Sequence, residues 1–143
     1  MEILLQAAAS FGAVVTLGLI FCVPKRFLVY SGLAGALGWT TYIVVREICG
    51  NGMLVMFFAA LLVALASHLF ARSCKAPVTV FLITGILPLV PGVGVYRIVY
   101  YLLAGDNPMA GYYFIYTLQM AGMIAVAILI MDTVFKIIGQ KRG

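Results

Sequence analysis

Pro88-Leu89-Val90-Pro91-Gly92 interrupts an apolar run from Val78 to Leu103 that is otherwise long enough to cross a bilayer as one helix. A proline inside a helix removes an amide donor and clashes with the carbonyl one turn earlier, and the nearby Gly92 and Gly94 weaken the helix further. In hydrocarbon, unwound backbone persists only where it is buried in protein or lines a watery cavity. The stretch therefore predicts a broken membrane crossing with a functional site at the break.

The composition excludes a water-soluble domain. Of the 143 residues, 65% are hydrophobic and 9% are charged, and the mean hydropathy is +1.18, whereas soluble domains carry about a quarter charged residues. The net charge of +5 does not indicate nucleic acid, because the basic residues form short clusters between apolar segments. We expect an all-α integral membrane protein that forms a single transmembrane domain over residues 1–143.

Five apolar segments are long enough to cross a membrane, and short gaps with turn residues separate them. They run from Ile3 to Val23, Phe27 to Val45, Met53 to Ala71, Val78 to Leu103 and Tyr112 to Ile138. The first segment lacks a preceding basic region and is too long for a signal sequence, so we expect it to remain as a helix. Small residues at four-residue spacing predict faces where helices approach closely. These pairs are Ser31 and Gly35, Ala34 and Gly38, Ala60 and Ala64, and Ala121 and Ala125.

The charged residues predict the orientation of the chain. With five crossings, one side holds Lys25, Arg26, Arg72, Lys75, Lys136, Lys141 and Arg142, and the other side holds Glu2, Arg46, Glu47 and Asp106. Because cytoplasmic loops carry an excess of lysine and arginine, we expect the N-terminus outside and the C-terminus in the cytoplasm. The alternative is a re-entrant hairpin, but it inverts this pattern, and each half of about 12 residues spans only ~18 Å of a ~30 Å core.

Arg97 is the only strong charge well inside an apolar segment. An arginine there costs about 2.5–3.5 kcal/mol on insertion scales, so it needs a partner, a wet cavity or a route to the interface. Two interpretations stay open, since its side chain either faces a cavity or extends to the outer headgroups. Glu47 is the one acid in the chain placed to pair with Arg97, and otherwise a substrate carboxylate or a second subunit supplies the charge.

The break and the polar residues near its depth predict a substrate site. The half-helix before the break presents carbonyls and the half-helix after Gly92 presents free amides, which suit a carboxylate or an amino-acid zwitterion. Polar residues of similar depth form either a polar path or hydrogen bonds within the bundle, namely Gln6, Ser10, Thr40, Thr41, Arg97 and Gln119. Tyr96, Tyr100 and Tyr101 form either a pocket wall or, with Tyr112 and Tyr113, an interfacial aromatic belt. The candidate substrate-binding residues are Thr40, Pro88, Pro91, Gly92, Gly94, Tyr96, Arg97 and Gln119.

No pattern in the chain indicates catalysis, a cofactor or a metal site. There is no nucleophile elbow, zinc-protease motif, phosphate-binding loop or carboxylate pair, and the chain has only four acidic residues. Cys22, Cys49 and Cys74 are widely spaced and are expected to be ordinary small membrane residues. His68 and Asp132 fall near the cytoplasmic end, where an interfacial role is favoured over a proton relay.

Three stretches carry a resemblance to a known family. The run from Pro77 and Phe81 through Gly85-Ile86-Leu87-Pro88-Leu89-Val90-Pro91-Gly92 to Tyr96 resembles the signature segment of the threonine/serine exporter family, in its small-subunit or C-terminal half. Val23-Pro24-Lys25-Arg26 and Gly35-Ala36-Leu37-Gly38-Trp39 are similar to the first loop and second helix of that half. By the family motif, Pro88, Pro91, Gly92 and Tyr96 carry over as functional positions.

The resemblance implies a multi-pass protein of the bacterial plasma (inner) membrane and no cofactor. In this family two five-helix halves, fused or separate, export small hydroxy-amino acids using the proton gradient, and some members are assigned to dicarboxylates. Because the chain corresponds to the second half, we expect a subunit that exports threonine or serine with a larger membrane partner. The alternatives are a dicarboxylate exporter subunit, a non-transporting assembly subunit, and a homo-oligomeric channel.

Overall fold

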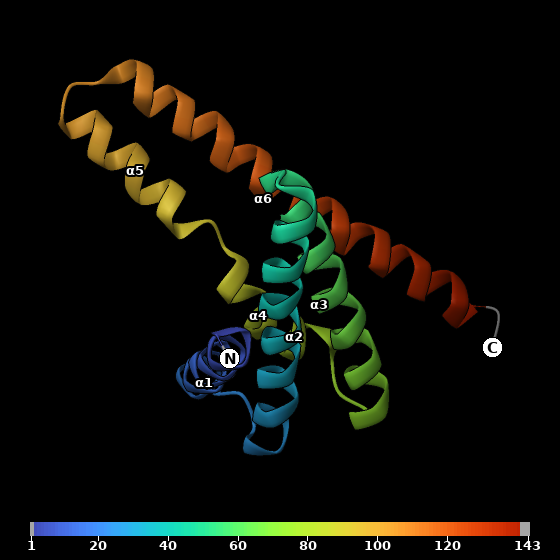
Figure 1. The fold of residues 1–143 in the computed structure, drawn as a ribbon. Coiled ribbons are helices and arrows are strands. Elements are labelled where there is room, and N and C mark those ends of the chain that lie inside the picture. Colours follow the sequence, from blue (N-terminus) through green and yellow to red (C-terminus); the bar gives the residue numbers. More distant parts are fainter. Residues whose placement is uncertain (1, 141–143) are drawn as a thin grey trace.

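The computed structural model describes residues 2–140 as a bundle of helices (Figure 1). The predictions for Lys141 and Arg142, and for the side chain of Glu2, fall outside the described parts of the chain. The elements are α1 (Glu2–Ile20), α2 (Lys25–Cys49), α3 (Gly52–Cys74), α4 (Val78–Ile86), the short 3-10 helix η1 (Leu87–Leu89), α5 (Gly92–Leu103) and α6 (Asn107–Gln140). Four helices are long and apolar enough to cross a membrane, and α4–η1 with α5 makes a fifth if this bent pair crosses as one unit. The all-helical, multi-pass membrane fold is therefore confirmed.

α3 lies at the centre of the bundle, where it packs against α2, α4 and α6. Half of its apolar window is buried, compared with a third for α2 and smaller shares for α1 and α6. The main core cluster joins α3 to the break and to α6 through Met56, Ala59, Ala60, Val63, Leu89, Ile124 and Ala127. Since Leu89 belongs to this cluster, the break is anchored in the core of the bundle.

Small residues let α1 and α3 approach α2 closely, as the four-residue spacing predicts. Ser31, Ala34, Gly35, Gly38, Ala60 and Ala64 are all buried. A methyl group added to Gly38 would overlap Val63 of α3, and one added to Gly35 would overlap Val14 of α1. The prediction was wrong for Ala121 and Ala125, which are exposed on α6. α6 turns Ile124 and Ala127 toward the core instead, so the two alanines lie on its outer face.

Local signals set the helix ends. Gly50 follows α2 in the left-handed conformation (φ 62°), and its amide donates to the carbonyl of Arg46 at 3.1 Å. The Asp106 carboxylate accepts a hydrogen bond from the amide of Met109 at 3.1 Å, which caps α6. The last segment therefore begins at Asn107 rather than at the predicted Tyr112, because Asp106 and Pro108 start the helix instead of forming a loop. At 34 residues, or about 51 Å, α6 exceeds a ~30 Å hydrocarbon core.

The helix breaks where the two prolines predict. α4 ends at Ile86, η1 includes Pro88, Val90 is extended (φ −60°, ψ 128°), and α5 begins directly after Pro91. Neither proline has an amide hydrogen to donate, so a continuous helix through this stretch would lack two hydrogen bonds. α4–η1 and α5 meet at an angle of 50°. The break therefore redirects the chain away from the bundle.

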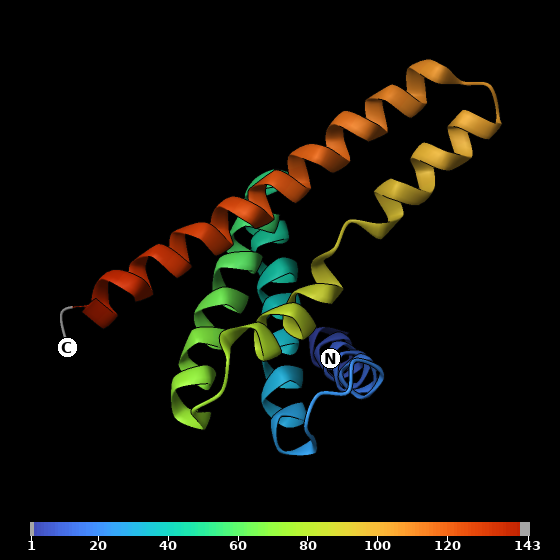
Figure 2. The same cartoon turned by 180° about the vertical axis from the view of Figure 1, so that it is seen from behind.

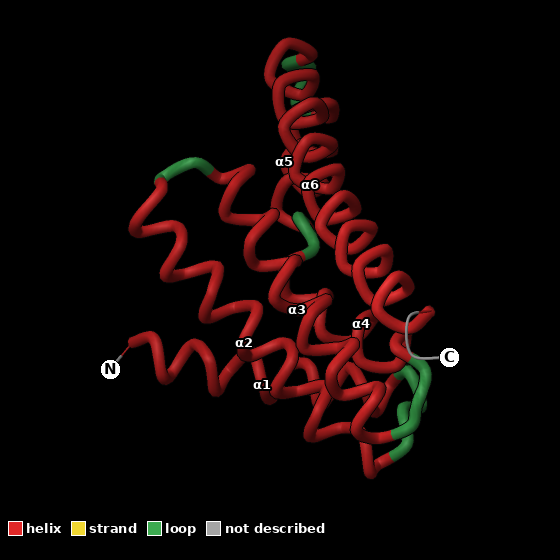
Figure 3. Tube along the Cα trace, turned by 90° about the vertical axis from the view of Figure 1, so that its right-hand side faces the viewer, coloured by secondary structure: helices red, strands yellow, loops and turns green. Residues whose placement is uncertain are grey.

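α5 and the first part of α6 form a hairpin that projects from the other helices, here called the arm (Figures 1 and 2). The two helices also run side by side in the view turned by 90° (Figure 3). Within the described chain, α5 packs only against α6, and none of its residues is buried. The α1–α2 and α3–α4 connections, with Lys25 and Lys75, lie at one end of the bundle, while the α2–α3 and α5–α6 turns lie at the other (Figure 1).

Candidate functional site

A cavity of about 440 Å³ lies at the break, between the arm and the bundle. Its size falls within the range of about 300–1,000 Å³ that is typical of small-molecule sites. The break lines one side with Pro88, Pro91 and Gly92, α5 adds Gly94 and Arg97, and α2, α3 and α6 supply the rest of the lining. The unwound backbone therefore lines a cavity, as its place in an apolar segment requires.

Arg97 lines this cavity and is held by a tyrosine of the arm. Its Nη1 donates to the hydroxyl of Tyr113 at 2.9 Å, and its guanidinium carbon lies 5.0 Å from the centroid of the same ring. Glu47, the in-chain acid considered as its partner, does not pair with it, since no carboxylate of a described side chain lies within 4.0 Å of the guanidinium. The hydrogen bond to Tyr113 uses one of the five N–H donors of the guanidinium, and the other four have no partner among the described residues.

Gly94 lets α5 approach α6 at the floor of the cavity. A methyl group added there would overlap the hydroxyl oxygen of Thr117 and would lie 3.2 Å from the Thr117 Cβ and Cγ2 atoms. Thr117 is 8% exposed, and its hydroxyl has no hydrogen-bond partner. Glycine at position 94 is therefore a requirement of the packing between the two helices of the arm.

The cavity is electropositive. Arg46, at the end of α2, lines it together with Arg97, and no acidic residue of the described chain does so. The N-terminus of α5 also faces it through Gly92 and Gly94, whose amides donate to the carbonyls of Val90 and Pro91 at 2.7 and 3.1 Å. A helix start carries a partial positive charge from its dipole. Two guanidinium groups and a helix start thus favour an anion or a carboxylate-bearing molecule.

The structure brings five of the eight candidate residues together. Pro88, Pro91, Gly92, Gly94 and Arg97 all line the cavity at the break. The other three candidates lie elsewhere. Tyr96 and Gln119 are exposed outside the cavity lining, and the Thr40 hydroxyl donates to the carbonyl of Ala36 in its own helix at 2.8 Å.

Several lining residues had not been singled out from the sequence. The aromatic wall of the cavity is Trp39, Tyr42, Tyr113 and Tyr116, rather than Tyr96, Tyr100 and Tyr101. Trp39 and Tyr42 stack with centroids 5.2 Å apart, and Met120 and Thr117 complete the α6 side. These residues belong to α2 and α6 rather than to the broken segment. Whether they face the break depends on how α2 and α6 are rotated about their own axes.

The other polar residues of similar depth mostly bond within the bundle. Trp39 Nε1 donates to the Gln6 side-chain oxygen at 3.3 Å, and the Ser10 hydroxyl donates to the carbonyl of Gly35 at 3.2 Å. Thr41, like Thr40, bonds to a carbonyl of its own helix. Gln6, Ser10, Trp39 and Pro88 share a shallow groove beside the cavity. Of the two interpretations, hydrogen bonding within the bundle describes these residues.

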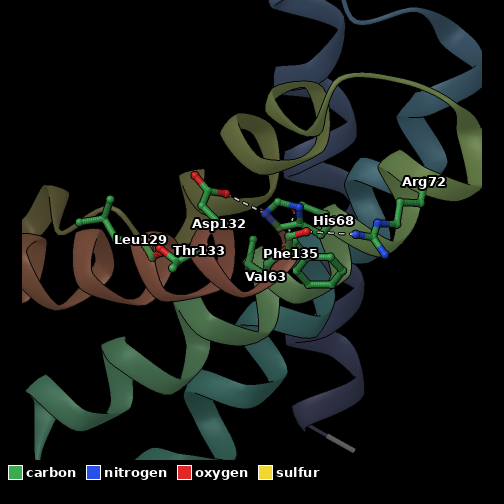
Figure 4. Close-up of polar contacts among 8 residues, drawn as sticks. Val63, His68, Arg72, Leu129, Asp132, Thr133 and Phe135 are labelled. Carbon is green, nitrogen blue, oxygen red and sulfur yellow. Dashed lines mark hydrogen bonds and ion pairs between the residues drawn. The ribbon is translucent and has the colours of Figure 1, made fainter. Parts of the chain in front are cut away.

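A second, polar cavity of about 340 Å³ lies where α3, α4 and α6 meet. There His68 Nε2 and Asp132 Oδ1 are 2.7 Å apart, with 11% and 39% of their side chains exposed (Figure 4). The His68 ring stacks on Phe135 with centroids 4.4 Å apart and planes 4° apart, and Arg72 donates to the Phe135 carbonyl at 3.3 Å. Sixty-four positions separate the two residues in the chain, so sequence alone did not pair them.

No metal or disulfide chemistry arises among the described residues. No group of three or more His, Cys, Asp and Glu side chains comes together there. Cys22 and Cys49 are exposed free thiols, and Cys74 is a half-buried one. Neither cavity therefore offers the ligand set of a metal centre.

The family model described as threonine/serine exporter, ThrE, matches residues 6–134, which include every residue that lines the cavity at the break. Neither the curated proteins nor the solved structures gave a match. The chain belongs to the threonine/serine exporter family, which is a family of membrane transporters and not of enzymes.

Proposed function

We propose that this member of the threonine/serine exporter family moves small carboxylate-bearing metabolites out of the cell through the cavity at the break. The observation that carries the proposal is the position of Arg97. Its guanidinium lines a cavity formed by unwound backbone and has no acidic partner among the described side chains. A charged group in an apolar crossing is a functional site by default, and a substrate carboxylate would supply the missing charge.

Threonine and serine are the first candidate substrates, because the family match supports hydroxy-amino acids. Their carboxylate would bind Arg97 near the positive end of the α5 dipole. Their ammonium group would bind the π faces of Trp39 and Tyr116, since no acid of the described chain lines the cavity.

A dicarboxylate of succinate type is the second candidate, and the two arginines favour it. Arg46 and Arg97 line the same cavity without a neutralising carboxylate. A dianion with one carboxylate at each guanidinium would balance both charges, whereas a zwitterion would place its ammonium group near a second cation. Transport of succinate should therefore depend more strongly on Arg46 than transport of threonine.

The function includes a larger membrane partner, which corresponds to the other half of the transporter. The arm supports this proposal because α5 contacts only α6 within the described chain and has no buried residue. A partner helix against the arm would cover the exposed apolar side chains of α5. The orientation we propose has the N-terminus outside and the ends that carry Lys25 and Lys75 in the cytoplasm of a bacterium, at its plasma membrane. Transport against the substrate gradient is proposed to use the proton gradient.

Export measurements test this proposal. Cells without their own exporters receive this chain, a larger membrane subunit that resembles the other half of the transporter, or both, and efflux of threonine, serine and succinate is followed. We expect efflux of at least one substrate with both subunits and little with either alone. Unchanged efflux in every combination would contradict the proposal, and efflux with this chain alone would favour a self-sufficient homo-oligomer.

The Arg97→Gln variant distinguishes a role of this chain in substrate transport from a role in assembly alone. A charge-assisted hydrogen bond contributes about 1.5–3 kcal/mol, so we expect transport at low substrate concentration to fall about 10- to 100-fold. Arg26→Gln is the matched control, because Arg26 lies over Phe27 at the opposite end of the bundle. A non-transporting assembly role would instead leave export unchanged in Arg97→Gln at equal membrane levels.

A further inference from the structure

The polar cavity where α3, α4 and α6 meet contains an acid–base pair that substrate binding at the break does not use. His68 is the only histidine of the chain, and its Nε2 lies 2.7 Å from Asp132 Oδ1. The imidazole is 11% exposed and stacks on Phe135, so its orientation is fixed from two sides. Of the other three acids, Asp106 caps α6, and Glu2 and Glu47 lie near helix ends. Asp132 is thus the one acid placed within a long helix away from its ends.

The tautomer of the imidazole follows from the charge of Asp132. An ionised carboxylate can only accept a hydrogen bond, so with Asp132 ionised Nε2 carries a proton and donates a hydrogen bond to Oδ1. Nδ1 is then the nitrogen with a free lone pair. A proton from a hydronium ion in the cavity can form an N–H bond at Nδ1 and leave water behind, and the reverse step releases it. The Nε2–H donation to Asp132 persists in both states, so no contact of the pair has to break.

The charged groups around the pair come from two helices. α3 contributes Arg72, and α6 contributes Asp132 and Lys136. α4 contributes only Val78, Thr79 and Leu82 to the same cavity, so it adds no titratable group. The imidazole therefore has one carboxylate and two cations as its charged neighbours in this cavity.

Two elements connect this cavity to the cavity at the break. α4 lines the polar cavity through Val78 and Leu82, and the η1 helix that directly follows it lines the cavity at the break through Pro88 and Leu89. α6 lines both, with Thr117 in one and Asp132 in the other. A change of charge at the pair therefore acts on the two elements that also shape the cavity at the break.

We propose that His68 and Asp132 form the proton-binding site that couples export to the proton gradient, with His68 Nδ1 as the atom that takes up and releases the proton. The proposal rests on the proposed export function. Asp132 holds the imidazole in place and balances its charge, and the proton reaches Nδ1 from the polar cavity. Aspartate and histidine side chains form proton relays in many pumps and transporters.

Everted membrane vesicles that contain this chain and its partner subunit test the proposal. An acid interior should drive accumulation of labelled substrate by the wild-type protein. His68→Gln keeps an N–H donor for Asp132 but takes up no proton, so we expect accumulation to fall to the level seen without a pH gradient. Exchange of labelled for unlabelled substrate needs no net proton movement and should continue. Asp132→Asn is the second variant, and we expect the same separation of accumulation from exchange.

Thr133→Ala is the matched control, because Thr133 follows Asp132 on α6 and its hydroxyl bonds only to the carbonyl of Leu129. It should keep both accumulation and exchange. Gradient-driven accumulation at the wild-type level in both His68→Gln and Asp132→Asn would overturn the proposal. Absence of transport by the wild-type protein would instead contradict the proposed function.

A measurement that needs no substrate tests the proton-binding site separately from the proposed export function. Since the chain has one histidine, the 15N signals of its imidazole are assigned without ambiguity. In lipid bilayers, we expect acidification to protonate Nδ1 while Nε2 keeps its proton, and these signals distinguish the two nitrogens. An Nδ1 signal that acidification leaves unchanged would overturn the proposal, whether or not export is observed.

Discussion

Replacement of Gly94 by alanine is expected to force α5 away from α6 and to weaken export. The added methyl group would overlap the Thr117 hydroxyl and would stand 3.2 Å from two Thr117 carbon atoms. Carbon atoms prefer separations of about 3.5–4.0 Å, so the two helices have to separate by at least about 0.3 Å, and by more to clear the hydroxyl. Backbone shifts forced in this way cost about 1–3 kcal/mol. The arrangement with α5 packed on α6 should therefore lose about 5- to 150-fold in population relative to one in which the two helices have separated.

Thermal unfolding in detergent and export in cells measure this effect together. Gly94→Ala should lower both the midpoint of unfolding and the export rate. Thr117→Ala removes the overlapping oxygen and Cγ2, so the double variant should recover most of the loss. Gly111→Ala is the matched control, because nothing lies within 4 Å of a methyl group there. Equal stability and export in Gly94→Ala and Gly111→Ala would refute the reasoning, and so would the absence of rescue by Thr117→Ala.

Three further predictions concern the framework of the site. Gly38→Ala should destabilise the protein by about 1–3 kcal/mol, because its methyl group would overlap Val63, and Val63→Ala in the same chain should restore part of the midpoint of thermal unfolding. Asp106→Ala should cost about 0.5–2 kcal/mol by removing the cap of α6, whereas Asp106→Asn should cost less, and faster amide exchange at Met109 would report the lost cap. Replacement of both Pro88 and Pro91 by alanine should reduce the 50° bend, as seen in distances between spin labels on α4 and α5, and an unchanged bend would show that packing rather than proline sets it.

The fold was largely predictable because its signals are local. The prolines at 88 and 91 mark the break, and glycine and asparagine mark the turn after α2. The start of α6 was predicted five residues too late, since Asp106 and Pro108 are common both in turns and at helix starts. The small residues of α2 and α3 were assigned correctly to contacts, but Ala121 and Ala125 were not, because one spacing fits any face of a helix.

The candidate site was predictable only where it lies on the broken segment. Pro88, Gly92 and Arg97 follow from proline chemistry and from the cost of a charge in an apolar segment. Trp39 and Thr117 belong to other helices, and their part in the cavity depends on helix rotation, which sequence does not specify. The pairing of His68 with Asp132 likewise depends on how α3 packs against α6.

Protection of a cysteine in the cavity tests the central claim that substrate binds at the break. In a chain with Cys22, Cys49 and Cys74 replaced, Val93→Cys places a single thiol in the cavity lining, and Leu103→Cys places one on α5 outside it. With the partner subunit present, we predict that the exported substrate slows labelling of Val93→Cys and leaves Leu103→Cys unchanged, and that Arg97→Gln abolishes the protection. Equal labelling of Val93→Cys with and without the substrate that the cells export would contradict the account.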